Sequence, residues 1–68
     1  MHSEIMDGEV ERIKALLKYM IHHNEQHVQE LAELLDLLPP DVCKKLRMSI
    51  GTFEVANVEL QLVLECLE

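Results

Sequence analysis

The two adjacent prolines in LLPPD, residues 37–41, are the strongest break in this sequence of 68 residues. A proline lacks the backbone N–H that a helix interior needs, and it disfavours a helical conformation at the residue before it, here Leu38. The prolines therefore divide the chain into two segments of similar length. A chain this short has room for one small domain, so both segments belong to a single fold over residues 1–68.

The first segment has the spacing of a helix that packs against a partner. Apolar residues recur along it at alternating intervals of four and three, interrupted only by one asparagine and one histidine. These positions are Met6, Val10, Ile13, Leu17, Met20, Asn24, His27, Leu31, Leu34 and Leu38. Ser3 or Asp7 is suited to cap the start of such a helix. We predict a helix over about residues 7–38 and a turn at residues 39–40.

The second segment continues the same spacing after the prolines. Its positions are Cys43, Leu46, Ile50, Phe53, Asn57, Leu60, Leu64 and Leu67. A strand is the alternative in FEVANVELQLVL, residues 53–64, where β-branched residues and a short alternation occur. A lone strand would leave its backbone edges unpaired. We therefore predict a second helix over about residues 41–67, with Gly51 and Thr52 as a point of local weakness.

Two helices with so short a connection fold back on each other. The predicted fold class is all-α, an antiparallel two-helix hairpin. Beside the second seam, Val55, Leu62 and Cys66 form a further apolar stripe that one hairpin cannot bury. We therefore expect a homodimer in which two hairpins make an antiparallel four-helix bundle. Folds near this size usually need such an additional source of stability.

Composition excludes several classes of function. Thirteen acidic residues against six Lys and Arg give a net charge of −7, which repels nucleic acid. Every apolar run ends well short of the roughly 20 residues that span a bilayer. Cys43 and Cys66 lack CxxC spacing and no leader pattern is evident, so we expect a cytoplasmic protein. We find neither a glycine-rich phosphate loop nor a nucleophile with its base, and we expect no enzyme activity.

Three of the four histidines lie in IHHNEQHVQEL, residues 21–31. His23 and His27 are four residues apart, so on a helix their nitrogens can converge on one ion, and Glu30 follows about one turn later. We take His22, His23, His27 and Glu30 as candidate metal ligands, although His22 lies off the seam and is better suited to the surface. Two ligands per chain are incomplete, but a twofold dimer doubles them. Zinc, nickel and cobalt are the candidate metals because all accept imidazole.

Asn24, His27 and Asn57 are the polar residues that interrupt the two seams. If residues whose numbers sum to about 79 lie level across the hairpin, Asn57 lies beside residues 22–24. In one interpretation the asparagines support the metal ligands from behind, in a small protein that handles or senses nickel, cobalt or zinc. In the other, the three residues form a hydrogen-bonded layer that sets register and specificity in a dimeric module that binds another protein.

The run LLKYMIHHNEQHVQELAEL, within residues 16–35, resembles a group of short, functionally uncharacterised prokaryotic proteins. In those proteins an amphipathic helix carries the motif H-N-x-x-H and a second helix follows. The matching residues here are His23, Asn24 and His27. The relatives carry a further histidine and an aromatic residue one turn earlier, where this chain has Tyr19 and Met20. The resemblance implies that the three motif residues act as a unit, and it implies no activity.

Overall fold

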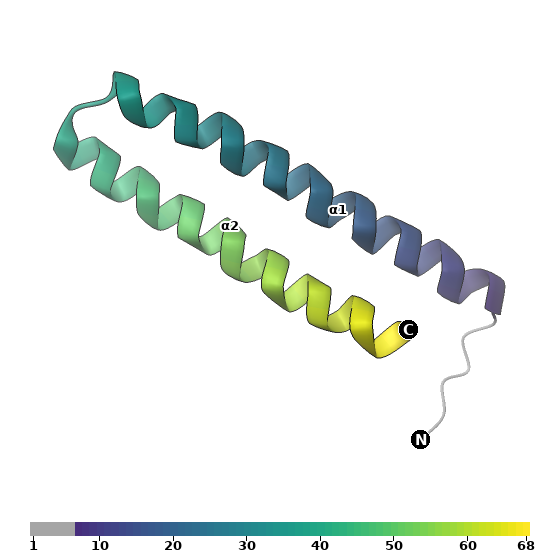
Figure 1. The fold of residues 1–68 in the computed structure, drawn as a ribbon. Coiled ribbons are helices and arrows are strands. Elements are labelled where there is room, and N and C mark those ends of the chain that lie inside the picture. The colour runs from purple at the N-terminus through teal and green to yellow at the C-terminus, as the bar shows by residue number, and fades with distance from the viewer. Residues whose placement is uncertain (1–6) are drawn as a thin grey trace.

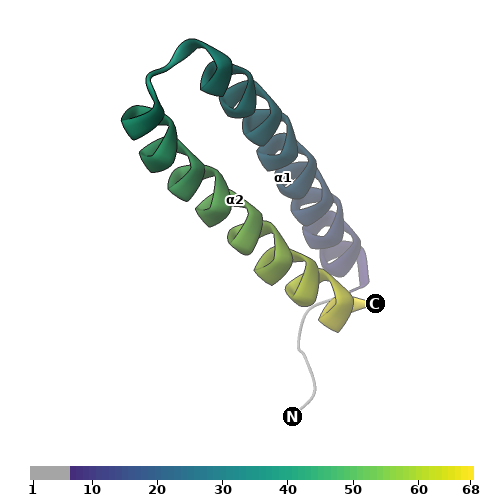
Figure 2. The same cartoon turned by 60° about the vertical axis from the view of Figure 1, so that its left-hand side comes forward.

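A computed structural model of the protein describes residues 7–68, and there it shows two long helices folded into an antiparallel hairpin (Figure 1). Helix α1 spans Asp7–Leu34, the 3-10 turn η1 spans Leu35–Leu37, and helix α2 spans Pro40–Leu67. Residues 7–68 contain no strand, so the helical prediction for residues 53–64 is confirmed. The view in Figure 2 shows the same side-by-side arrangement. Ser3 and Met6 lie outside the described residues.

The connection between the helices begins earlier than the spacing predicts. We expected the first helix to reach residue 38, but α1 ends at Leu34 and η1 carries the chain to Leu37. Leu38 is extended, with φ −112° and ψ 151°, as the residue before a proline prefers to be. Pro40 occupies the start of α2, where a missing N–H removes no helical hydrogen bond. A 3-10 turn at the end of a helix tightens the chain before it reverses.

Cys43 joins the two sides of this connection. It is 5% exposed, and its sulfur lies 3.0 Å from the carbonyl oxygen of Leu35 and 3.3 Å from that of Leu38. Its backbone N–H donates to the carbonyl of Pro39 at 2.9 Å. Carbonyls near the end of a helix have no partner inside the helix, so a thiol donor at this point satisfies one of them. The first turn of α2 is thereby tied to the end of η1.

The two helices share one narrow apolar contact. Cys43 and Leu64 are the only hydrophobic residues in 7–68 that are buried, at 5% and 4% exposure. The other apolar residues of the contact keep part of their surface in solvent: Ile13, Leu17, Ile21, Leu31, Leu46, Ile50, Phe53, Leu60 and Leu67. The hairpin therefore has a contact line and almost no interior.

Large apolar side chains remain exposed on both helices. The shortest principal dimension of the molecule is 12 Å, about the diameter of one α-helix with its side chains. The stripe of Val55 and Leu62 was expected beside the Phe53 seam, but it lies on the opposite side of α2, at 59% and 56% exposure. Two residues turn a helix by about 200°, which accounts for this placement of Val55 relative to Phe53. Charged residues interrupt α1 and α2 too often for either to cross a bilayer.

A pair of hydrogen bonds crosses the hairpin near its middle. The side-chain amide of Asn24 donates to Oδ1 of Asn57 at 2.9 Å, and Nδ2 of Asn57 donates to the carbonyl of Ile21 at 3.2 Å. Both bonds are partly buried. Asn57 thus lies beside residues 21–24, as the predicted register requires. The two bonds fix the register of α1 relative to α2.

Replacing Asn24 with Ala should lower the free energy of unfolding by about 1–2 kcal/mol, because the partly buried Asn57 then loses its partner. Replacing both Asn24 and Asn57 with Leu should recover most of that stability, since no polar group remains unpaired. Urea denaturation of the three proteins measures the difference. A double variant less stable than Asn24→Ala would contradict the pairing.

Candidate functional site

The rings of His23 and His27 meet at the edge of the hairpin contact, on α1. Their Nε2 atoms lie 2.9 Å apart. The ring centroids are 4.3 Å apart and the planes are inclined by 79°. The side chain of His27 is 44% exposed, so the pair is open to solvent on one side. The structure therefore brings together two nitrogen atoms that can each bind a proton or a metal.

Glu30 contacts the other nitrogen of His27. Its Oε1 lies 3.1 Å from Nδ1 of that ring. An ionised carboxylate only accepts hydrogen bonds, so Nδ1 of His27 carries the proton. In the neutral ring Nε2 then has a free lone pair, and Nε2–H of His23 donates to it. Glu30 thus sets the tautomer and orientation of His27, and it approaches the ring from the side away from the Nε2 pair.

Two aromatic side chains flank the histidines. The ring of Tyr19 stacks on His23 with centroids 5.6 Å apart and planes inclined by 15°. Phe53 of α2 lies against His27 at 6.3 Å between centroids. Sequence reasoning assigned no role to either residue at this site. The position of Tyr19, four residues before His23, was a signal that would have found it, because such pairs share a helix face.

The remaining predicted residues lie apart from the Nε2 pair. His22 is on another side of α1, where its side chain is 71% exposed and its Nδ1 lies 3.9 Å from Oε1 of Glu25. Asn24 donates to Asn57 and Asn57 donates to the carbonyl of Ile21, and within residues 7–68 neither asparagine bonds to a histidine ring. No group of three or more His, Cys, Asp or Glu in this range is arranged to hold a metal ion. One chain therefore offers two nitrogen ligands.

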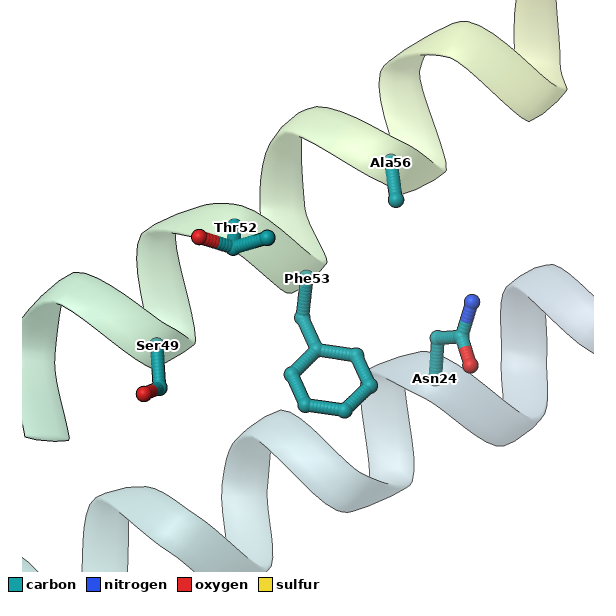
Figure 3. Close-up of a pocket in the computed structure, with 5 residues that line it drawn as sticks. All are labelled: Asn24, Ser49, Thr52, Phe53 and Ala56. Atoms are coloured by element: carbon teal, nitrogen blue, oxygen red, sulfur yellow. The ribbon is translucent and has the colours of Figure 1, made fainter.

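Two shallow hollows border the histidine pair. One, of about 380 Å³, is polar and is lined by His23, Gln26, His27, Gln29, Glu30 and Glu33. The other, of about 370 Å³, is lined by Asn24 from α1 and by Ser49, Thr52, Phe53 and Ala56 from α2. Figure 3 shows Phe53 extending from α2 toward α1 beside Asn24, with the short side chains of Ser49, Thr52 and Ala56 on the neighbouring turns of α2. The short side chains leave an apolar depression between the helices.

The family model called "Domain of unknown function (DUF8180)" matches residues 13–67. The match covers most of the chain, so the chain belongs to this family. The matched segment is also the part of the chain in which α1 faces α2. In the register that places His27 of α1 opposite Phe53 of α2, the two ends of the segment, Ile13 and Leu67, lie opposite each other. No curated protein and no solved structure matches the chain. The family therefore corresponds to the hairpin, and its name states no activity.

Replacing Glu30 with Ala should change the tautomer of His27, because Nδ1–H loses its acceptor. In the wild-type protein, long-range ¹H–¹⁵N spectra should show Nδ1–H at His27 and Nε2–H at His23, recorded at about pH 8.5, well above the reference imidazole pKa of about 6.5. The variant should show a mixture of both tautomers at His27. The matched control is Glu25→Ala beside His22, which should leave His23 and His27 unchanged. An Nε2–H ring at His27 in the wild-type protein would contradict the assignment.

Proposed function

We propose that this chain is a small protein that binds a divalent transition metal, zinc, nickel or cobalt, through Nε2 of His23 and Nε2 of His27. The observation that carries the proposal is their separation of 2.9 Å. Two nitrogens that bind one ion at about 2.0–2.1 Å and a tetrahedral angle lie about 3.3 Å apart. A small rotation of either ring accommodates this distance. For His23 to bind the ion through Nε2, the proton on that nitrogen must leave it and Nδ1 of the same ring must take up a proton from solvent, so the neutral ring changes tautomer when the ion binds.

The surroundings of the pair support this proposal. Histidines that bind metals usually donate their second ring N–H to a carboxylate, and His27 has this contact with Glu30. Stacking on Tyr19 limits rotation of His23, and Phe53 limits rotation of His27. A net charge of −7 raises the local concentration of cations around the chain. Glu30 is a positioning residue in this proposal, and His22 takes no part.

The ligands that one chain lacks come from a second copy in this proposal. Met20, His27 and Leu34 belong to the predicted seam of α1, but in the structure they lie at its edge, where together with Leu16 and His23 they form a stripe at heptad spacing. Its apolar members are open to solvent, with Leu16 58%, Met20 40% and Leu34 43% exposed. Such a stripe is typical of a helix–helix contact. We infer that two hairpins bury these stripes against each other in a four-helix bundle.

The position of the histidines along the hairpin suits a twofold axis. His27 lies level with Phe53, near the middle of the segment 13–67 in which the helices face each other. A twofold axis perpendicular to the helices at this level brings the histidine pairs of both copies to the same height. Four imidazoles then converge on one ion or on two adjacent ions. The apolar depression beside Phe53 has room for side chains of the second copy.

A second candidate function is a dimeric interaction module without metal. The hydrogen bonds from Asn24 to Asn57 and from Asn57 to Ile21 favour it, because they are satisfied inside the hairpin and fix helix register. In this alternative the histidine pair extends the same polar layer. It then sets the number and orientation of the chains, and another protein is the partner.

Replacing His23 or His27 with Ala should abolish stoichiometric binding of zinc or nickel, because each removes half of the ligands that a chain supplies. Calorimetry on tag-free protein at about pH 7.5 measures the binding, since imidazole is then mostly neutral. Metal at 100 times its dissociation constant should stabilise the wild-type fold by about 2.7 kcal/mol, and thermal melts of the two variants should show no such gain. His22→Ala is the matched control and should bind normally.

The absence of saturable binding of zinc, nickel and cobalt to the wild-type protein would contradict the metal proposal and leave the interaction module. In that case His27→Leu should be neutral or stabilising, because the polar layer contributes little net stability and Glu30, which is 72% exposed, can bond to water in place of His27. The variant should also lose its single oligomeric state. Sedimentation and urea denaturation measure the two effects.

Replacing Met20 with Glu should dissociate the proposed dimer, because the substitution puts a charge into the stripe that two hairpins bury. Sedimentation should then give the 7.9 kDa of one chain, and twice that mass for the wild-type protein at the same low micromolar concentration. The control is Ala15→Glu, on an exposed side of α1 away from the stripe. A wild-type protein that sediments as one chain would contradict the dimer.

A further inference from the structure

The outer side of α2 carries an apolar stripe that the contacts described so far leave uncovered. Met48, Val55 and Leu62 repeat every seven residues, and Val58 and Cys66 continue the row at heptad spacing. The side chains are open to solvent, with Met48 71% and Val58 62% exposed. We call these five residues the outer stripe of α2. It spans about 27 Å at 1.5 Å per residue, which is enough for five turns of a helix–helix contact.

The charges of α2 are separated along its length. Lys44, Lys45 and Arg47 lie near its start, whereas Glu54, Glu59 and Glu65 lie in its second half. Apart from Asp41 in the first turn of α2, this order opposes the helix macrodipole, which favours acidic residues at the start and basic residues at the end. This order of charges does not stabilise the hairpin through ion pairs, because no ion pair within 4.0 Å joins α1 to α2 in residues 7–68. The order therefore needs another explanation.

We propose that the outer stripe of α2 binds the same stripe of a second copy in antiparallel orientation, across a twofold axis at Val55. Residues whose numbers sum to about 110 then lie opposite each other, as in an antiparallel helix pair. Met48 faces Leu62 of the second copy, and Val55 faces its own counterpart. The row is thus complementary to itself at Met48, Val55 and Leu62 when it is reversed, whereas Val58 lies opposite Thr52 and Cys66 opposite Lys44.

The charges select this orientation. In the antiparallel pair the basic start of each helix lies beside the acidic end of the other, and Arg47 comes close to Glu65 of the second copy. A parallel pair would place basic residues together and acidic residues together, and like charges at such spacing destabilise a helix contact. Two equivalent sets of opposite charges flank the stripe in the antiparallel pair.

This surface is separate from the stripe of Met20, His23 and His27. Pairing through α2 leaves the histidine pair free, so pairs of chains joined through the histidine-bearing face can associate further through α2. The outer stripe is one helix wide, whereas the histidine-bearing face includes both helices of the hairpin. Pairing through α2 is therefore the weaker contact, and it requires the higher protein concentration.

Val55→Glu tests the contact, because it puts two like charges at the twofold axis. In sedimentation at rising concentration, the wild-type protein should form species of at least four times the 7.9 kDa of one chain, and the variant should stop at twice that mass. Gln61→Glu, an exposed residue beside the stripe, is the matched control and should behave like the wild-type protein. If the proposed dimer through the histidine-bearing face does not form, the wild-type protein should reach twice the mass of one chain through α2 alone, and Val55→Glu should remain a single chain.

Two further variants determine the orientation. Cys66→Ser combined with Val55→Cys should oxidise to a disulfide-linked pair of chains, because Val55 faces its own counterpart at the axis. Cys66 of the wild-type protein should not cross-link under the same conditions, since an antiparallel pair separates the two copies of this residue. Arg47→Glu and Glu65→Arg should each weaken the association at least fivefold, and the double variant should regain most of it.

The proposal is overturned if Val55→Glu associates as the wild-type protein does, or if the Val55→Cys protein fails to cross-link. Cross-linking through Cys66 of the wild-type protein in place of Val55→Cys would also overturn it, because that result requires parallel helices. Circular dichroism should show all variants to be as helical as the wild-type protein, since the substituted side chains lie outside the hairpin contact. If Val55→Glu does not fold, the charge-reversal pair decides the outcome.

Discussion

Two helices can contact each other along only one line, and this limit determines which side chains of the protein are buried. Each helix carries two apolar stripes, whereas the hairpin contact uses one stripe of each. Among the residues whose burial the structure describes, only Cys43 and Leu64 lose nearly all of their exposure, because a single helix layer has no second layer to cover the rest. The remaining stripes must be buried by other chains, or the chain exposes an unusual amount of apolar surface for its size.

The two polar pairs of the hairpin differ in how completely they are satisfied. Asn24 and Asn57 lie inside the contact and bond to each other and to a carbonyl of α1. His23 and His27 lie at nearly the same height along the hairpin as the asparagines, but in the stripe that faces outward. In the described chain their side chains form hydrogen bonds only with each other and with Glu30. The asparagine pair thus fixes the register of the hairpin. The histidine pair can still bind a proton, an ion or a group of another chain.

Much of the fold could be predicted because its signals are local. Pro39 and Pro40 mark the reversal of the chain, and heptad spacing marks both helices and brings Asn57 beside residues 21–24. The bond of Cys43 to Leu35 and Leu38 could not be predicted, because it depends on the path of the connection in space.

The candidate site was predictable only in outline. Spacing brings Glu30 near His27, but the same spacing fits a metal ligand and a residue that orients the ring. The 3.1 Å contact of Glu30 with Nδ1 of His27 supports the role of orienting the ring. The stripe of Val55 and Leu62 was predicted to stay outside the hairpin contact and does so, but it lies farther around α2 from the seam than expected, because two residues turn a helix by about 200°.

The metal and dimer proposals are thermodynamically linked, and this link separates them from the interaction module. Two imidazoles per chain cannot fill the coordination sphere of zinc or nickel with protein ligands, whereas two copies supply four. Metal then binds the paired state more tightly than the single chain, so metal must strengthen pairing by the same factor by which pairing strengthens metal binding. A polar layer that only sets register has no such reciprocal dependence. Metal affinity that rises with protein concentration is therefore the property that identifies a site shared between two chains.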